Sequence, residues 1–191
     1  VIPLVQSFGH MENVLARKRF KTMRESDEAI GDICPLHPKA VNIILEMIDD
    51  LLSTHAGYIR RIHLGGDEVW SLGHCPKCRA FVKKHGKAGL YLQHIMPILD
   101  YTLALNLRPL LWDDMMREWP MGELRKLGKK ADLVPWSYGD KPFMNVPHKV
   151  SYRVMDRFQK AGIALWGASA FKGADGANID IAFFNSRRNN L

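Results

Sequence analysis

The stretch Ile62-His63-Leu64-Gly65-Gly66-Asp67-Glu68-Val69-Trp70 places two adjacent carboxylates after an apolar run and a glycine pair. In a regular strand, Asp67 and Glu68 would face opposite sides. A bulge at the glycines lets both reach one pocket, where mutual repulsion suits one acid and one anion. The dipeptide alone also fits a plainer interpretation, in which two exposed acids cap the next helix.

The same arrangement recurs along the chain, where short apolar runs end in small or polar residues. These runs, which we interpret as strands, cover residues 1–5, 59–64, 108–112, 132–136 and 162–166. Apolar residues at helical spacing separate them: a helix begins at Pro38 and stops at Gly57, a second has a face from Tyr91 to Leu105, and a third covers Arg153 to Ala161.

Strands that alternate with helices, and that show no polar face, predict an α/β fold with a parallel sheet. Polar residues at the strand ends, without a glycine-rich phosphate loop, favour a (β/α)8 TIM barrel over a nucleotide-binding sheet. Five strands are fewer than eight. We therefore expect a truncated barrel over residues 1–191, with about strands three to seven present, a start inside the domain and a cut helix in the tail.

Four motifs in order resemble family 20 glycoside hydrolases, the β-N-acetylhexosaminidases, and most closely their hexosaminidase D branch. The motifs are Val1 to His10, His63 to Glu68, Leu110 to Met115 and Trp166 to Gly173, which are similar to strands three, four, five and seven of that family. The resemblance implies a retaining exo-enzyme that removes terminal GlcNAc or GalNAc from glycoconjugates.

The resemblance also implies substrate-assisted catalysis, an exception to the usual scheme of two catalytic carboxylates. The substrate's 2-acetamido oxygen would attack C1 and form an oxazolinium ion. Glu68 would act as general acid and base, and Asp67 would orient the acetamido group.

The end of strand seven supports this mechanism independently of the resemblance. It reads Trp166-Gly167-Ala168-Ser169, and no carboxylate follows until Asp175. A barrel glycosidase with a protein nucleophile needs a carboxylate there, so this alternative is disfavoured. A second alternative is a truncated, inactive isoform that binds N-acetylhexosamine, since five strands cannot close a barrel and its exposed edges favour aggregation.

Further candidates for substrate binding stand at the strand ends. We expect Trp112 to stack on the sugar or to fill the core, and one of Asp113 and Asp114 to accept sugar hydroxyls while the other caps a helix. The remaining candidates are His10, which has a structural alternative, Tyr138 for the acetamido oxygen, and Trp136 and Trp166 as pocket walls.

Cys75 and Cys78 in His74-Cys75-Pro76-Lys77-Cys78 have the spacing of half a zinc site. A closed site needs four ligands, and the only other cysteine is Cys34. We therefore interpret the motif as a loop detail, and we expect no stoichiometric metal and no cofactor.

Charge and composition limit the classes of partner that the chain is expected to bind. The net charge is +7, and the basic residues are densest in two patches, at residues 17–24 and 125–130. We interpret both patches as solvated helix faces and not as a nucleic-acid surface. No run of about 18 apolar residues predicts a membrane span. The expected partners are β-linked N-acetylhexosamine glycans, and a homodimer is left open. The expected compartment is the cytoplasm, with nuclear, secretory or vesicular locations as alternatives.

Overall fold

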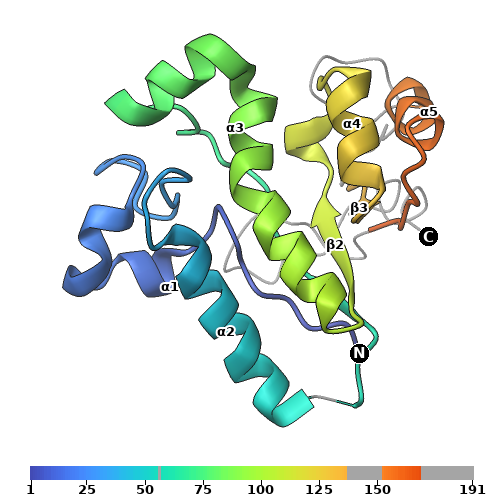
Figure 1. Cartoon of the computed structure of the whole chain (residues 1–191), viewed down its shortest axis with the longest axis horizontal. Coiled ribbons are helices and arrows are strands. Elements are labelled where there is room, and N and C mark those ends of the chain that lie inside the picture. The colour runs from blue at the N-terminus through green and yellow to red at the C-terminus, as the bar shows by residue number, and fades with distance from the viewer. Residues whose placement is uncertain (56, 137–151, 169–191) are drawn as a thin grey trace, which may run out of the picture.

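The computed structural model describes residues 1–55, 57–136 and 152–168, and its centre is a parallel sheet. The strands β1 (Arg61–His63), β2 (Arg108–Trp112) and β3 (Asp132–Val134) lie in the order β1-β2-β3 (Figure 1). In the register, His63 pairs with Leu110, and Leu110 pairs with Asp132. All three strands therefore end at the same edge, where residues 64–70, 113–116 and 135–136 follow.

Two further segments extend this parallel order on both sides. Leu4 forms a parallel bridge with His63, and the Val5 N–H donates to the His63 carbonyl at 2.8 Å. On the other side, Leu133 bridges Leu165 in parallel. The five predicted strand segments thus lie side by side in chain order, which confirms the predicted α/β class.

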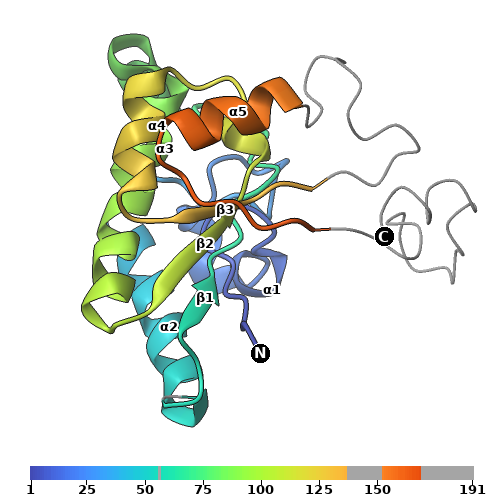
Figure 2. The ribbon, with the colours of Figure 1, turned by 90° about the vertical axis from the view of Figure 1, so that its right-hand side faces the viewer.

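Helices connect consecutive strands and cover one face of the sheet. Figure 2 shows α2 (Ala40–His55), α3 (Pro76–Ala104) and α4 (Met121–Gly128) on the same side of the three strands. The helix α5 (Tyr152–Lys160) follows β3 and contacts α4. The buried side chains of α2 and α3 recur at helical spacing, as the apolar pattern predicts, and include Ile44, Ile48, Ile95 and Ile98.

The helix α3 begins much earlier than its apolar face suggests. Its first turn starts at Pro76, Cys75 is the N-cap, and Gly86 interrupts it with a φ of 72°. Residues 76–88 are mostly polar and exposed, so no apolar stripe announces this part in the sequence. The buried stripe begins at Leu90, close to the predicted face.

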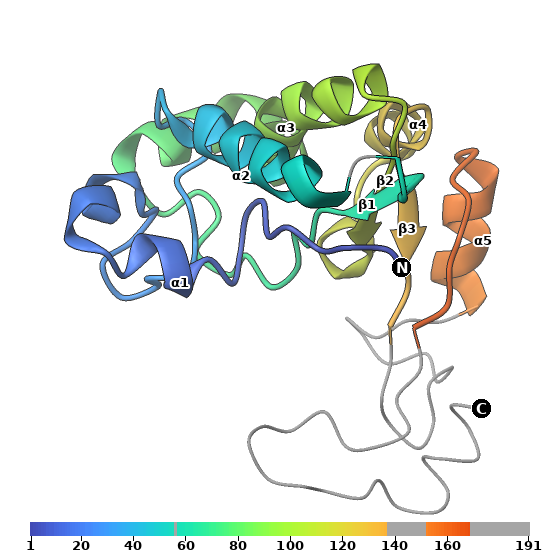
Figure 3. The same ribbon diagram turned by 90° about the horizontal axis from the view of Figure 1, so that it is seen from below.

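Residues 12–23 form short elements away from the sheet (Figure 3). Figure 3 shows α1 (Glu12–Leu15) at the opposite end of the molecule from α5. The first basic patch, predicted as an amphipathic helix, is instead a 3-10 helix, η1 (Lys18–Met23); Lys18, Arg19 and Lys21 on it are exposed. Among the described residues, no helix combines the length and apolarity that crossing a membrane requires.

Candidate active site

The loop after β1 turns through backbone conformations that L-residues rarely adopt. Gly65, Gly66 and Glu68 have φ values of 62°, 81° and 50°. A side chain at Gly66 would meet the Tyr91 hydroxyl, since a Cβ there would lie 2.2 Å from that oxygen. The hydroxyl donates to the Gly66 carbonyl at 2.7 Å, so the glycine lets a buried tyrosine hold the loop.

This turn brings the two carboxylates to one histidine. His10 Nε2 lies 3.4 Å from Asp67 Oδ2 and 3.4 Å from Glu68 Oε2. His10 itself has a φ of 55° and follows Gly9, where a Cβ would lie 2.4 Å from the Asp67 carbonyl oxygen. The first and second strand segments therefore meet tightly at their carboxyl ends, and Asp67 and Glu68 face the same side.

The two carboxylates differ in their surroundings. The Asp67 side chain is 16% exposed, whereas that of Glu68 is 37% exposed. Burial raises the pKa of Asp67, and the nearby charge of His10 opposes this rise. In the part of the chain that the structure describes, Asp67 Oδ1 is buried and accepts no hydrogen bond. A buried acceptor without a donor is costly, so this oxygen is suited to a donor brought by a ligand.

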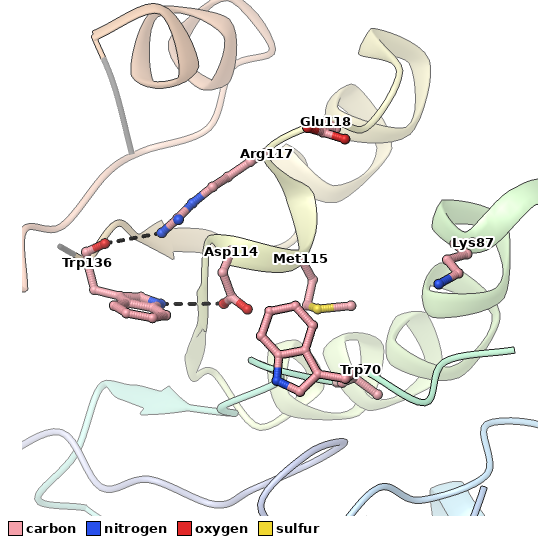
Figure 4. A pocket seen from close by; sticks show the side chains of 8 residues that line it. Trp70, Lys87, Asp114, Met115, Arg117, Glu118 and Trp136 are labelled. Atoms are coloured by element: carbon pink, nitrogen blue, oxygen red, sulfur yellow. Dashed lines mark hydrogen bonds between the residues drawn. The ribbon is translucent and has the colours of Figure 1, made fainter. Parts of the chain in front are cut away.

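Asp114 ties Glu68 to the neighbouring strand ends. Its Oδ2 accepts the Glu68 N–H at 2.9 Å, and its Oδ1 accepts the Trp136 indole N–H at 3.4 Å (Figure 4). Asp114 opens the short helix η2 (Asp114–Met116) after β2, and Trp136 follows β3. One carboxylate thus links the loops after three strands.

The sequence left open which of Asp113 and Asp114 faces the sugar, and the structure places Asp113 in the interior. It has no exposed surface, and it accepts two bonds from Arg117, at 2.7 and 2.8 Å. The Trp136 N–H also points to Asp113 Oδ1 at 3.3 Å. Because its oxygens accept bonds inside the protein, Asp113 holds the backbone of residue 136. Of the two aspartates, only Asp114 lines the cavity described next.

A cavity of about 540 Å³ opens beside Asp114 (Figure 4). It is lined by Val69, Trp70, Lys87, Asp114, Met115, Arg117, Glu118 and Trp136. Trp70 was not among the predicted site residues, although it stands two positions after Glu68. Trp70 is 74% exposed, which is unusual for tryptophan, and Figure 4 shows its ring beside Met115 among the residues that line the cavity.

The remaining predicted residues lie at different distances from this centre. Trp112 is half-buried, with its ring centroid 4.3 Å from that of His63. Trp166 does not line the cavity. Its indole N–H donates to Asp132, the first residue of β3, and its ring packs under the guanidinium of Arg61, the first residue of β1. Its predicted role as a pocket wall is therefore not supported. Tyr138 lies outside the described residues.

His63 supports the glycine turn from below, a role that the sequence did not reveal. Its Nδ1 accepts the Gly65 N–H at 3.0 Å, and the ring is buried under Trp112. Burial lowers the pKa of His63 to about 4, so the ring is neutral near pH 7. The histidine before the glycine pair was the available signal.

The chain is similar to known proteins over most of its length. The model of the glycosyl hydrolase family 20 catalytic domain matches residues 4–155. Hexosaminidase D of Bos taurus is 34% identical over 185 residues, covering 93% of this chain and 52% of the relative. Hexosaminidase D of Homo sapiens is 35% identical over 183 residues, covering 92% of this chain and 37% of the relative. The chain thus spans about half or less of the length of these relatives.

Solved structures with low sequence identity share the fold. Dispersin B matches with a TM-score of 0.62 at 12% identity, over 91% of this chain and 51% of that structure. The β-N-acetylhexosaminidase from Bacteroides fragilis NCTC 9343 matches with a TM-score of 0.63 at 16% identity, over 90% of this chain and 32% of that structure.

Proposed function

Because the chain belongs to glycosyl hydrolase family 20, we propose that it carries the catalytic centre of a retaining exo-β-N-acetylhexosaminidase. The proposed reaction removes terminal GlcNAc or GalNAc from glycoconjugates through an oxazolinium intermediate. The observation that carries the proposal is the cluster of His10, Asp67 and Glu68, in which one imidazole nitrogen lies 3.4 Å from both carboxylates.

Glu68 is the proposed general acid and base. It is the more exposed of the two carboxylates, so an aglycone and a water molecule can both reach it. In the first step, the C1–O bond breaks as the Glu68 proton moves to the departing oxygen and the acetamido oxygen bonds to C1. In the second step, Glu68 accepts a proton from the water that attacks C1, and the acetamido group is released.

Asp67 is the proposed partner of the acetamido N–H. Its buried Oδ1 lacks a donor among the described residues, and the substrate would supply one. An ionised Asp67 also stabilises the positive charge that develops on the oxazolinium ring, and this effect is strong because the side chain is largely shielded from water. Asp67 lies beside the acid and not across the sugar from it, which suits a positioning role better than that of a nucleophile.

Asp114 and Trp136 are the proposed contacts for the rest of the sugar. They line a cavity of about 540 Å³, a volume within the usual range of small-molecule pockets. Asp114 would accept hydroxyl protons, and the tryptophan rings of Trp70, Trp112 and Trp136 would supply apolar surface for stacking.

The test is turnover of matched aryl glycosides by a form of the protein that completes the barrel. We expect hydrolysis of aryl N-acetyl-β-glucosaminide and N-acetyl-β-galactosaminide, with the β-anomer as first product in an NMR time course. Aryl β-glucoside, which lacks only the acetamido group, should be a very poor substrate. Equal rates on the glucoside, or the α-anomer as first product, would refute the proposal.

A further inference from the structure

We propose that Cys34, Cys75, Cys78 and Glu25 form a structural zinc site that fastens the N-terminal segment to the start of α3. The ligand atoms of these four residues all lie within 4.8 Å of one another. Cys34 Sγ is 3.8 Å from Cys75 Sγ and 3.6 Å from Cys78 Sγ. This proposal replaces the expectation that the Cys75–Cys78 motif is a loop detail.

The spacing of the sulfurs matches a metal-bound tetrahedron. Zinc–sulfur bonds of about 2.3 Å at tetrahedral angles place neighbouring sulfurs about 3.8 Å apart. A disulfide would need about 2 Å. All three cysteines are free thiols in the structure, and Cys34 and Cys78 are buried.

Glu25 supplies the observation that points to a cation. It is 2% exposed, and its Oε1 accepts the Cys75 N–H at 3.0 Å. Its Oε2 is buried with no hydrogen-bond partner in the described part of the chain. A buried carboxylate without a counter-charge is costly, and a divalent ion bound through Oε2 removes that cost.

The backbone explains why residues so far apart in sequence converge. Arg24 and Ile33 form an antiparallel bridge, in which Glu25 N–H donates to Asp32 and Cys34 N–H donates to Met23. Glu25 and Cys34 therefore lie diagonally on the same face of this pair.

The start of α3 presents the other two ligands. Cys75 is the N-cap of α3, Pro76 is its first residue, and Cys78 lies in the first turn with its N–H directed at Cys75 Sγ, 3.4 Å away. Two residues in a Cys-x-x-Cys spacing can bind one ion, and the positive end of the helix dipole favours thiolates. Three thiolates and one carboxylate around Zn²⁺ have the same net charge as a four-cysteine zinc site, and this donor set suits zinc among the common metals.

The site has a structural consequence for the loop that carries Asp67 and Glu68. Next to the cluster, Asp32 Oδ2 accepts both the N–H and the hydroxyl of Ser71, at 3.0 and 2.7 Å. A metal at Glu25 and Cys75 would therefore fix the far end of the loop that begins at Gly65. The ion would hold structure and would not contact the substrate.

The first test is metal analysis of the 191-residue chain, produced with zinc and dialysed against metal-free buffer. We expect about one zinc per chain, and we expect the Cys34→Ser and Cys78→Ser variants to lose it. His74→Ala is the matched control: His74 adjoins Cys75 but is exposed and outside the cluster, so this variant should retain the metal. Substoichiometric zinc in the unmodified chain, or full zinc in Cys34→Ser, would overturn the proposal.

Two further measurements do not depend on the folding of cysteine variants. Cobalt substituted into the unmodified chain should give intense tetrahedral d–d bands and a thiolate charge-transfer band. Glu25→Gln keeps an acceptor for the Cys75 N–H but offers a poor ligand, so zinc affinity should fall more than about tenfold. An octahedral cobalt spectrum or an unchanged affinity in Glu25→Gln would each contradict the site.

Discussion

The main-chain N–H of Glu68 donates a hydrogen bond to Asp114 Oδ2 at 2.9 Å. Glu68 adopts a φ of 50°, a conformation that costs free energy for a residue with a side chain. This bond to Asp114 helps to hold the conformation and fixes the direction in which the Glu68 side chain leaves the loop. Asp114 is therefore a positioning residue for the proposed acid as well as a proposed sugar ligand.

Replacing Asp114 by alanine should lower kcat for an aryl N-acetyl-β-glucosaminide by about 10²-fold, since small misplacements of a catalytic group have effects of this size. The far-UV circular dichroism spectrum should not change, because Asp114 is only partly buried. The control is Asp156→Ala, which removes an exposed pair with Lys160 on α5. If both variants turn over like the unmodified protein, Asp114 does not position Glu68.

The Glu68→Gln variant tests the proposed acid directly. It should lose roughly 10²–10⁴-fold in rate on substrates with poor leaving groups, since these need a proton in the first step. Substrates with good leaving groups should lose less in that step, because they depart without protonation. A uniform small loss across leaving groups would assign the proton to another residue.

The strands and the turn that carries Asp67 and Glu68 follow from local sequence, which explains why they were predictable. Apolar runs of a few residues define strands, and side chains after parallel strands must gather at one edge. The glycine pair before Asp67 is itself a local signal for the turn. For these features, the nearest neighbours in the chain decide the structure.

The features that the sequence missed depend on partners distant in the fold. Asp113 and Asp114 are indistinguishable in sequence, and only the tertiary placement of Trp136 and Arg117 assigns one to the interior. Trp166 turns to Asp132 rather than to the cavity for a similar reason. Cys34 meets Cys78 from 44 residues away, a convergence that no spacing rule reveals.

The pH dependence of activity should reveal the link between His10 and Asp67. Burial raises the pKa of Asp67, and the charge of His10 opposes the rise. The proposed mechanism needs Asp67 ionised, so activity is lost as pH falls through this pKa. Replacing His10 by glutamine removes the opposing charge, and the acid limb of kcat/KM should then move to higher pH. If the acid limb stays in place or moves to lower pH, His10 does not lower the pKa of Asp67 in the active protein.

Stability should fall between about pH 6.5 and pH 4, because two buried histidines resist protonation. Burial lowers the pKa values of His63 and His94 to about 4. In the unfolded chain both rings take up protons near pH 6.5, whereas in the folded chain they remain neutral. The stabilisation from the two neutral rings is therefore complete above pH 6.5. By pH 4, each ring has lowered the free energy of unfolding of the protein by about 3 kcal/mol.

Urea titrations at several pH values measure this loss, and His94→Gln tests its origin. The His94 Nε2 lies 2.8 Å from the Ser7 carbonyl, and a glutamine amide can donate to the same oxygen without titrating. The variant should lose about half of the pH dependence. An unchanged slope would show that His94 is not the titrating group.

The last prediction concerns the source of the nucleophile. Gly167 and Ala168 follow Trp166 where a nucleophilic carboxylate would be needed, and Asp67 lies beside Glu68 at a shared imidazole. In the proposed mechanism, the attacking oxygen therefore belongs to the substrate's acetamido group. A thiazoline that mimics the oxazolinium ion should inhibit strongly, because it resembles the charged intermediate that Asp67 stabilises. The Asp67→Asn variant keeps the shape of the side chain but removes its charge. The affinity for the thiazoline should therefore fall far more than the affinity for GlcNAc. Fluorosugars that trap protein nucleophiles should leave the chain unlabelled, and a glycosyl adduct on any Asp or Glu in the mass spectrum would refute the substrate-assisted mechanism.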